Sequence, residues 1–426
     1  MFRRAFFFLA GTLAVAACGG TVPPPRSFVT MPGYGPTPMA PPPMPSSLPA
    51  PAGPAGRGIA LLAPLSGPNA ALGPALVNAA QLALAAEGSP GLDVRDTGGT
   101  PEGAAAAASA ALAAGAALII GPLTAAETAA VSPVARSAGV AVLAFTNDTG
   151  QAQPGVWTLG ITPVQQVRRL VGTAMTQNKG RFAAALPNSA FGQSMAAALT
   201  QALSAAGGPA PDIRFYESSN AGISGTLRDL SNYAGRRGPL EAQRRAALAL
   251  HTAEGRRQAA DLSRQSIPPP GFDSLLLAET GDRLAWLASF LSYYDIETPT
   301  VQVMGPTLWA APAARQGADL NGAWYAAPDP SVRASFDAAY AAKYGAAPPG
   351  VADFAFDAAA IGRVRAAEGN FSVAALCQPE GFAGADGLLA LQTDGTVRRG
   401  LALFAIDHAG ASMIEPAPAS VSTPGI

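Results

Sequence analysis

Short apolar runs alternate with longer amphipathic stretches in the first third of the chain that follows residue 58. The apolar runs are residues 59–63, 117–120 and 140–145, with 92–96 as a weaker strand signal, and the helical stretches are 70–87, 102–114 and the residues after Thr124. A run without polar positions, such as 117–120, is typical of a strand that is covered on both faces. Strands and helices in this alternation predict a parallel sheet with right-handed crossovers.

The same alternation starts again near residue 161 and continues to about residue 406. Its predicted strands are 182–186, 213–216, 274–278, 300–304 and 322–326, and its predicted helices are 163–177, 191–206, 282–294, 331–344 and 351–368. The last strands, 387–391 and 396–406, flank the turn Thr393-Asp394-Gly395, which predicts a hairpin. We therefore expect an α/β fold of two lobes, each a mostly parallel sheet flanked by helices. Spacing alone leaves open how often the chain crosses between the lobes.

The first 17 residues have the pattern of an export signal. Arg3 and Arg4 precede an apolar run that is too short to span a bilayer, and Val15-Ala16-Ala17 precede Cys18. This small-small-Cys ending resembles a bacterial lipobox, which predicts a lipoprotein signal peptide at 1–17 and an acylated, palmitate-bearing Cys18. The alternative is an ordinary signal peptide with an incidental cysteine. Gly19 resembles the residue found in lipoproteins of the outer membrane, so we expect a lipid anchor on its periplasmic face.

A proline-rich segment separates Cys18 from the folded body. It holds 13 prolines between residues 23 and 54. Helices and sheets do not tolerate this density, so residues 18–56 are predicted to be a flexible, extended linker without a core. Residues 57–410 form the predicted body, and residues 411–426 are predicted to be a disordered tail.

Composition excludes several classes of function. The chain has 27 Lys and Arg residues against 28 Asp and Glu, and this near-neutral balance argues against a nucleic-acid partner. The only lysines, Lys179 and Lys343, are not in a phosphate-binding P-loop. No HExxH, GxSxG or CxxC motif is present, and His251 and His408 are isolated. We expect no enzyme activity, no metal and no cofactor, and we interpret Cys377 as a small, buried apolar residue.

The order of several short motifs resembles the type I periplasmic binding proteins of the branched-chain amino-acid receptor class. These motifs are 59–67 with Gly73 and 78–83, then 119–124, Phe191-Gly192, 336–345, 356–358, 381–384, Gly387 and Asp394-Gly395. The segments 272–279, 284–295 and 305–309, with the helical stretch 225–265 before them, resemble the penicillin-binding-protein activator lipoproteins. This resemblance implies a regulator of peptidoglycan synthases, although the extra N-terminal helical-repeat domain of some activators is missing. The resemblance further implies that lobe 1 comprises about residues 58–159 and 326–385, and lobe 2 about residues 160–325 and 386–410.

The resemblance also implies a ligand cleft at the carboxyl ends of the parallel strands. An amino-acid carboxylate would meet the free amides of a helix start at Thr124 and Ala125, because such amides attract anions. Supporting and facing residues are Ser66, Gly67, Thr146 and Asn147, with Glu279 for an ammonium group and Phe191 and Trp309 for an apolar side chain. The alternatives are that Thr124 caps its own helix with Glu127, that Glu279 is a helix-start acid, and that the aromatic residues are core.

An arginine-rich segment is the second candidate site. Residues 228–264 hold eight arginines and four acids, or 8 − 4 = +4, in a chain of net charge −1. Spacing predicts the pairs Glu241–Arg245 and Arg257–Asp261, so much of this face would be solvated and self-paired. The excess, represented by Arg244, Arg245, Arg256 and Arg257, would dock an acidic protein or an anionic wall polymer. We therefore expect a synthase regulator, with a receptor of an ABC importer for amino acids or amides as the alternative.

Overall fold

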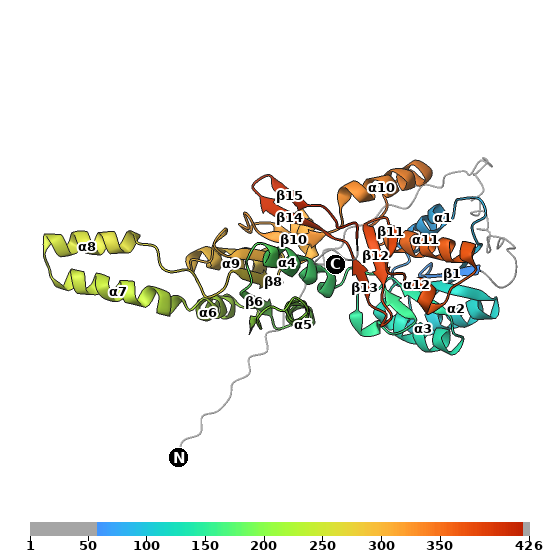
Figure 1. Cartoon of the computed structure of the whole chain (residues 1–426), viewed down its shortest axis with the longest axis horizontal. Coiled ribbons are helices and arrows are strands. Elements are labelled where there is room, and N and C mark those ends of the chain that lie inside the picture. Colours follow the sequence, from blue (N-terminus) through green and yellow to red (C-terminus); the bar gives the residue numbers. More distant parts are fainter. Residues whose placement is uncertain (1–57, 421–426) are drawn as a thin grey trace, which may run out of the picture. The chain divides into compact units, whose positions relative to one another are not determined.

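The computed structural model describes residues 58–420, which fold into two α/β lobes (Figure 1). The predicted signal peptide at 1–17, Cys18, the linker 18–56 and the last residues, 421–426, lie outside the described residues. Within 58–420, no helix is both long and apolar enough to cross a membrane. The expected α/β class with two lobes is confirmed.

Lobe 1 is built on a five-stranded parallel sheet of order β2-β1-β3-β4-β5. Its strands are β1 Gly58–Ala63, β2 Leu92–Asp96, β3 Ala116–Ile120, β4 Ala141–Ala144 and β5 Val156–Thr158. The sequence predicted the first four strands and missed the short β5. The alternate side chains of β1 enter two different cores, as expected for a strand that is covered on both faces.

Helices cover both faces of this sheet. The helices are α1 Gly73–Ala83, α10 Pro330–Tyr344 and α11 Ala352–Glu368 on one face, α2 Pro101–Ala113 and α3 Ala125–Ser137 on the other, and the short α12 Val373–Leu376. The α11 helix approaches the sheet closely at Gly362. A Cβ there would lie 2.5 Å from the Cδ1 atom of Ile59, so a larger residue would force the Ile59 side chain to move.

Lobe 2 contains a seven-stranded sheet of order β15-β14-β10-β9-β8-β6-β7. Its strands are β6 Phe182–Pro187, β7 Asp212–Tyr216, β8 Ser274–Leu277, β9 Gln302–Gly305, β10 Trp324–Ala327, β14 Ala402–Asp407 and β15 Gly410–Glu415. Its flanking helices are α4 Pro163–Thr176, α5 Ala190–Ala205, α6 Asn220–Leu230 and α9 Gly281–Tyr293. The strands β6–β10 pair in parallel, whereas β14 and β15 are antiparallel.

The C-terminal region differs from the prediction. The expected strand 396–406 is two strands, β13 Val397–Arg399 and β14, which belong to different sheets. β13 pairs with β12 Gly387–Leu391, which pairs with β11 Phe382–Gly384. Leu389, Leu391 and Val397 lie in the lobe 1 core, so residues 387–399 pack with lobe 1 and not with lobe 2 as expected. The predicted disordered tail from 411 instead begins with β15, because its backbone pairs with β14.

Between residues 58 and 420, the chain crosses between the lobes three times. The crossings follow β5, β10 and β13 and lie at residues 159–162, 328–329 and 400–401. Glycine is required at the third crossing, because a Cβ on Gly400 would lie 2.6 Å from the Pro418 carbonyl oxygen. The sequence left the number of crossings open, and the assignment of β13 and β14 to different sheets settles it.

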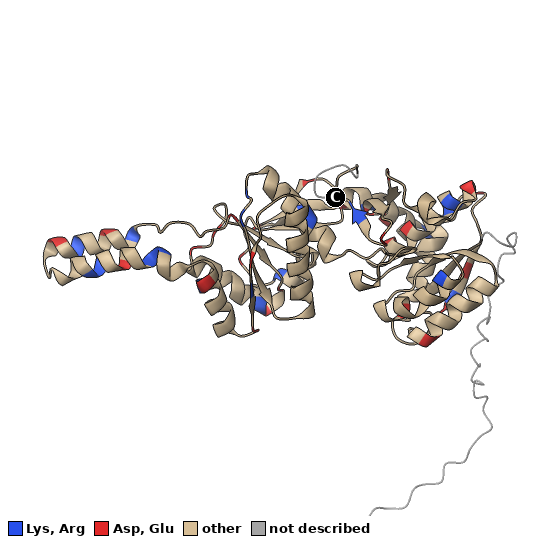
Figure 2. Cartoon of the chain, turned by 60° about the horizontal axis from the view of Figure 1, so that its bottom comes forward, with Lys and Arg blue, Asp and Glu red and all other residues tan. Residues whose placement is uncertain are grey.

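A helical hairpin extends from lobe 2 between β7 and β8. It consists of α7 Tyr233–Ala249 and α8 Ala253–Arg264, and we call it the arm. The arm projects away from the lobe 2 sheet in Figures 1 and 2, and charged residues are spaced densely along it. Only Ala247, Gly255 and Ala259 are buried within it. The arm therefore adds little to the hydrophobic core of the lobe.

Candidate functional site

A cavity of about 1060 Å³ lies between the two lobes. Lobe 1 lines it with the residues that follow β3 and β4, and lobe 2 with the starts of α4 and α5 and the residues after β9. Open α/β sheets bind ligands at the carboxyl ends of their strands, and this cavity occupies that position. Five of the predicted ligand residues line it: Thr124, Ala125, Thr146, Asn147 and Phe191.

The start of α3 is arranged as a complete capping box. The Thr124 hydroxyl donates to the Glu127 carboxylate at 2.7 Å, and the Glu127 amide donates back to Thr124 Oγ1 at 3.3 Å. The same carboxylate accepts the Thr124 amide at 3.0 Å. The capping alternative is thus observed, and Glu127 already places a carboxylate at the helix end where a ligand carboxylate was expected.

The loop after β4 forms the second part of the lobe 1 wall. Thr146 Oγ1 accepts the Asp148 amide at 3.1 Å, and the Asp148 carboxylate accepts the Gly150 amide at 2.9 Å. Asp148 is the only charged side chain that the described residues contribute to the cavity wall. Asn147 makes no side-chain hydrogen bond to any described residue, so its amide is available to a ligand.

Lobe 2 contributes a mainly apolar wall. Its residues at the cavity are Ile161, Pro163, Val164, Gln166, Ala190, Phe191, Ser194, Ala197, Ala198, Gln201, Thr307 and Leu308. Gln166 Oε1 is already occupied, because it accepts the Thr307 amide at 2.8 Å. No carboxylate is present among the described lobe 2 residues that line the cavity, so this wall offers nothing to neutralise an ammonium group.

Glu279 and Trp309, predicted as ligand residues, do not line this cavity. Trp309 is fully buried, and its indole Nε1 donates to the Glu279 carbonyl oxygen at 2.9 Å. The Glu279 carboxylate is buried and pairs with Arg283 one helical turn later at 3.0 Å. That hydrogen bond and ion pair raise the pKa of Arg283, and burial, with the nearby Glu279 charge, raises the pKa of Tyr216. The alternatives are therefore observed: Trp309 is a core residue, and Glu279 is an acid at the start of a helix.

Ser66 and Gly67 are also absent from the cavity wall, because their loop is fastened to β2. The Ser66 hydroxyl donates to Asp96 at 2.6 Å, and the Leu65 amide donates to the same carboxylate at 2.8 Å. Partial burial opposes the effect, but hydrogen bonds from Ser66 and from backbone amides hold the pKa of Asp96 below its ordinary value. Gly67 has a φ of +69°, and a Cβ there would lie 2.2 Å from the Gly98 carbonyl oxygen. These residues serve the loop and not a ligand.

Several cavity residues were not predicted from the sequence. Gln201 on α5 and Val351 and Phe354 at the start of α11 come from segments far from the strand ends that guided the prediction. Their positions depend on the packing of one lobe against the other, and no local motif marks them. Leu308 and Trp309 both lie in the short turn Thr307–Ala310 after β9, and the choice between these two neighbours required the tertiary structure.

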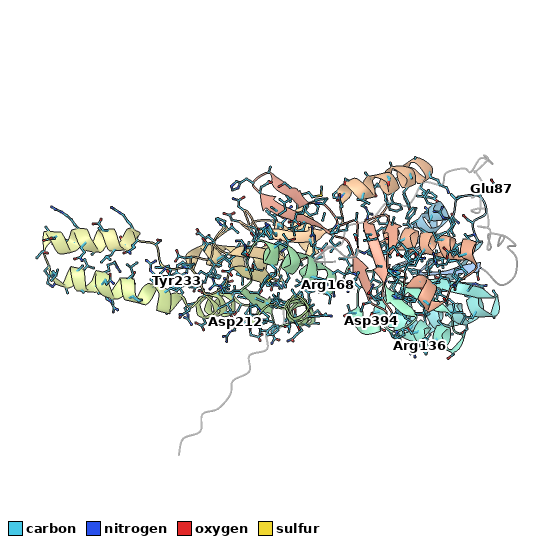
Figure 3. The ribbon with its side chains drawn as sticks, viewed as in Figure 1. Glu87, Arg136, Arg168, Asp212, Tyr233 and Asp394 are labelled. Atoms are coloured by element: carbon cyan, nitrogen blue, oxygen red, sulfur yellow. The ribbon has the colours of Figure 1, made fainter. Side chains whose placement is uncertain are left out.

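A smaller polar pocket of about 310 Å³ adjoins the cavity and shares Thr149, Val164 and Gln201 with it. Arg168 of α4 and Asp394 of the β12–β13 turn lie on its wall and are labelled in Figure 3. Burial and the neighbouring charge of Arg398 lower the pKa of Arg168, although Asp394 opposes them. Arg168 and Arg398 therefore lie on the adjoining pocket, and no Lys or Arg among the described residues lines the cavity itself.

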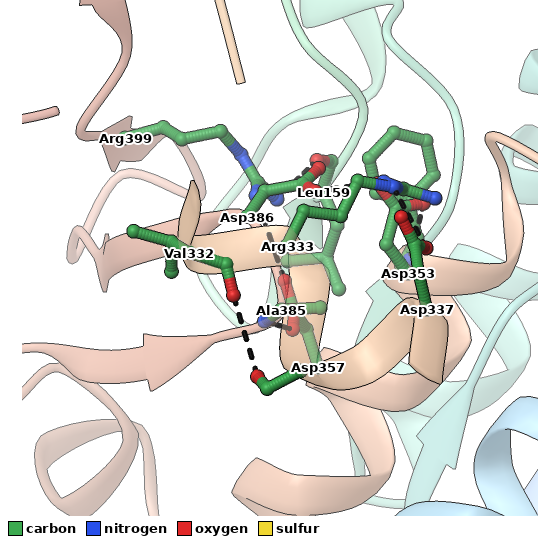
Figure 4. A network of polar contacts seen from close by, with 11 residues as sticks. Leu159, Val332, Arg333, Asp337, Asp353, Asp357, Ala385, Asp386 and Arg399 are labelled. Carbon is green, nitrogen blue, oxygen red and sulfur yellow. Dashed lines mark hydrogen bonds and ion pairs between the residues drawn. The ribbon is translucent and has the colours of Figure 1, made fainter. Parts of the chain in front are cut away.

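A buried network of acids and arginines joins the crossings, and we call it the hinge network (Figure 4). Arg333, at the start of α10, contacts Asp353 at 2.8 Å and Asp386 at 2.7 Å. Arg399, which directly precedes the third crossing, donates to the Leu159 carbonyl oxygen of the first crossing at 3.0 Å. Arg399 also contacts Asp357 at 3.5 Å. Through Arg399, the network thus links the first and third crossings to Asp357 of lobe 1.

Two carboxyl groups of the hinge network, those of Asp353 and Asp357, have raised pKa values. Burial raises the pKa of Asp357 to about 6, although Arg399 and the Ala385 amide oppose it. Burial, together with the hydrogen bond and charge of Asp386, raises the pKa of Asp353 well above its ordinary value. Three buried carboxyl groups face two guanidinium groups, so the network favours retention of a proton.

A family model described as periplasmic binding protein matches residues 58–234, which include the whole lobe 1 sheet and the first part of lobe 2. A search of curated proteins by sequence gave no significant match. Among solved structures, a putative branched-chain amino acid ABC transporter protein from Rhodospirillum rubrum has a TM-score of 0.63 and 17% identity. That comparison covers 84% of this chain and 100% of the other.

The C-domain of LpoA from Haemophilus influenzae, described as a regulator of PBP1A, is similar to a comparable degree. Its TM-score is 0.60 at 17% identity, and the match covers 84% of this chain and 99% of that domain. Against full-length LpoA the TM-score is 0.59 at 16% identity, and 59% of that longer chain is covered. At these identities the comparisons establish the architecture, and the chain has the fold of the type I periplasmic binding proteins.

Proposed function

We propose that the protein is a non-catalytic periplasmic regulator of a peptidoglycan synthase, held at the outer membrane by a lipid on Cys18. The lobe 2 wall of the interlobe cavity carries this proposal. A receptor for free amino acids needs a partner for the ligand ammonium group, and the described lobe 2 wall is mainly apolar and has no carboxylate. The one carboxylate that the described residues place on the cavity wall is Asp148 of lobe 1, which already accepts the Gly150 amide. An ammonium group buried against the lobe 2 wall would therefore lose hydration without an ionic partner there.

The lobe 1 wall supports the same proposal. Glu127 already occupies the α3 helix start through its contacts with Thr124. A ligand carboxylate at this place would meet a like charge, which is unfavourable in a partly buried site. The likeness to the LpoA C-domain, itself a regulator of PBP1A, is consistent with a fold of this type that serves protein regulation.

The alternative function is a receptor that delivers an amide or amino acid to an ABC importer. The size of the cavity favours it, since about 1060 Å³ would accept a small solute together with water. Asn147 and Gln201, which make no side-chain hydrogen bonds to described residues, would then contact a neutral polar group better than a charged one.

Native mass spectrometry of the full chain in detergent would separate the two functions. We expect a complex with a purified peptidoglycan synthase and no retained amino acid or amide after addition of a mixture of these solutes. Retention of one solute together with no synthase complex would overturn the regulator and support the receptor. The same spectra of the Cys18→Ser variant should lack the mass of the lipid, and an unchanged mass would contradict the proposed anchor.

A further inference from the structure

The two helices of the arm pack through small residues near the connection between them. Its two helices approach each other at Gly255, where a Cβ would lie 2.3 Å from the Ala247 carbonyl oxygen. Small residues make this contact, with Ala259 also buried. Large apolar residues are therefore not needed to hold the two helices together, and those found at the far end require another explanation.

The base of the arm is fixed to lobe 2. The Arg236 guanidinium donates to the carbonyl oxygens of Ser231, Pro268 and Tyr294, at 2.8, 3.0 and 2.6 Å. The ring of Tyr233 lies edge-on to that of Tyr294, with 5.1 Å between centroids. Tyr233 is labelled in Figure 3 where the arm meets the lobe. These contacts anchor the arm at its base, so its far end extends from a fixed point on lobe 2.

Two leucines are exposed at the far end of the arm. Leu248 in the last turn of α7 is 41% exposed, and Leu250 in the connection to α8 is 61% exposed. Single exposed apolar residues are common on protein surfaces. Leu248 and Leu250 lie within three positions of each other, on a hairpin that contributes little to the core. Together they form a small exposed apolar patch that a partner can cover.

Arginines without ion pairs surround these leucines. Arg256 and Arg257 make no ion pair with any described residue, and Arg245 contacts only the Glu241 backbone oxygen, at 3.4 Å. Nearer the base, Arg237 and Arg244 pair with the Glu241 carboxylate at 3.3 and 2.9 Å. The predicted pairs Glu241–Arg245 and Arg257–Asp261 do not form, so positive charge is concentrated beside the leucines. We call Arg245, Leu248, Leu250, Arg256 and Arg257 the arm tip.

We propose that the arm tip docks on a protein surface that has an apolar pocket bordered by Asp and Glu side chains. Leu248 and Leu250 fill the pocket, and Arg245, Arg256 and Arg257 contact the acidic border. This inference rests on the proposed function, in which a peptidoglycan synthase supplies that surface. Desolvated apolar anchors usually dominate the affinity of such an interface, whereas charges at its border mainly raise the association rate.

The arm tip fits a protein better than an anionic membrane or wall polymer. α8 also presents the exposed acids Glu254 and Asp261, which would face an anionic surface with the wrong charge. A polysaccharide offers no pocket for two leucine side chains. A folded partner can place basic groups opposite these acids and acidic groups opposite the arginines, and so match both signs.

Binding kinetics of the full chain in detergent with a purified peptidoglycan synthase test this proposal. We expect Leu248→Ser/Leu250→Ser to weaken the Kd at least tenfold, mainly through faster dissociation. Arg256→Gln/Arg257→Gln should lower the association rate several-fold and reduce its dependence on salt. The matched control is Leu65→Ser, a leucine of lobe 1 that is also 41% exposed and should leave the Kd unchanged. Equal thermal unfolding of all variants would show that the fold is intact.

The outcomes separate this inference from the proposed function. If the unmodified chain binds the synthase and both arm-tip variants bind equally well, the arm-tip proposal is overturned and the regulator remains. If the unmodified chain does not bind the synthase, both fail. Binding to vesicles of phosphatidylglycerol and phosphatidylethanolamine that the leucine substitutions abolish would overturn the protein partner in favour of a membrane.

Discussion

The hinge network and the arm use the same residue types for opposite purposes. In the hinge network, Asp357 and Arg399 are fully buried, and each side chain has few possible partners. On the arm, Arg256 and Arg257 are exposed and have water as an alternative to any partner. Burial therefore distinguishes Arg399, which holds the first and third crossings together through Leu159, from a solvated arginine on the surface.

This contrast explains why the charge pattern of the sequence alone was a poor guide to which charged residues stabilise the fold. The arm attracts attention in the sequence because its arginines are close together. The hinge network draws Arg333, Asp353, Asp386 and Arg399 from separate segments, and no local excess of charge marks any of them. A buried charge that loses its partner costs several kcal/mol, whereas an exposed ion pair contributes at most about 1 kcal/mol.

The largest effect should follow the loss of a buried arginine. Arg399→Met leaves Asp357 buried without its guanidinium and the Leu159 carbonyl oxygen without its donor. We expect the free energy of unfolding to fall by about 3–5 kcal/mol in denaturant titrations. Arg398→Met changes the exposed neighbour on the same strand and should stay within about 0.5 kcal/mol. Equal losses in both variants would contradict the distinction between buried and exposed charges.

The second effect is a dependence of stability on pH. The pKa of Asp357 is about 6 in the folded chain and near the ordinary 3.8 when unfolded, so the folded chain retains a proton that the unfolded chain releases. The stabilisation is complete below about pH 4 and is lost as the pH rises through 6, by up to about 1.4 kcal/mol per pH unit. Asp353 acts in the same direction. Asp357→Asn should flatten this slope, and Asp261→Asn on the arm should preserve it.

The third effect is local and concerns the base of the arm. Arg236→Met removes three hydrogen bonds to carbonyl oxygens, and a charged donor contributes about 1.5–3 kcal/mol to such contacts. We expect amide hydrogen exchange to increase about tenfold or more across residues 233–264, with little change in either lobe. Arg264→Met, on the exposed end of α8, provides the comparison. Unchanged exchange in the arm would show that the base contacts do not hold it.

The smallest effect on folding should come from the arm tip itself. Arg256→Gln/Arg257→Gln removes two charges that have no ion pair with described residues, and the free energy of unfolding should change by less than about 0.5 kcal/mol. Denaturant titration measures this value alongside the Arg399→Met variant. A loss of several kcal/mol here would mean that the arm tip is structural, and the contrast with the hinge network would disappear.

Local patterns predicted most of the helices and strands. The apolar run that became β3 and the Thr124–Glu127 spacing that became the α3 cap needed only neighbouring residues. The ligand-site predictions were less successful where a choice depended on side-chain direction. Trp309 turned into the core and Leu308 toward the cavity, although the two are adjacent in sequence.

The sequence by itself determined the two α/β lobes and the charged helical stretch between β7 and β8, because periodicity and caps act over a few residues. Only the tertiary structure decided that residues 387–399 pack with lobe 1, that the chain crosses three times, and that Arg399 reaches Leu159. Such contacts join segments more than two hundred residues apart. The free energy of these contacts depends on which side chains are removed from water together. Tertiary packing decides this, and local sequence does not.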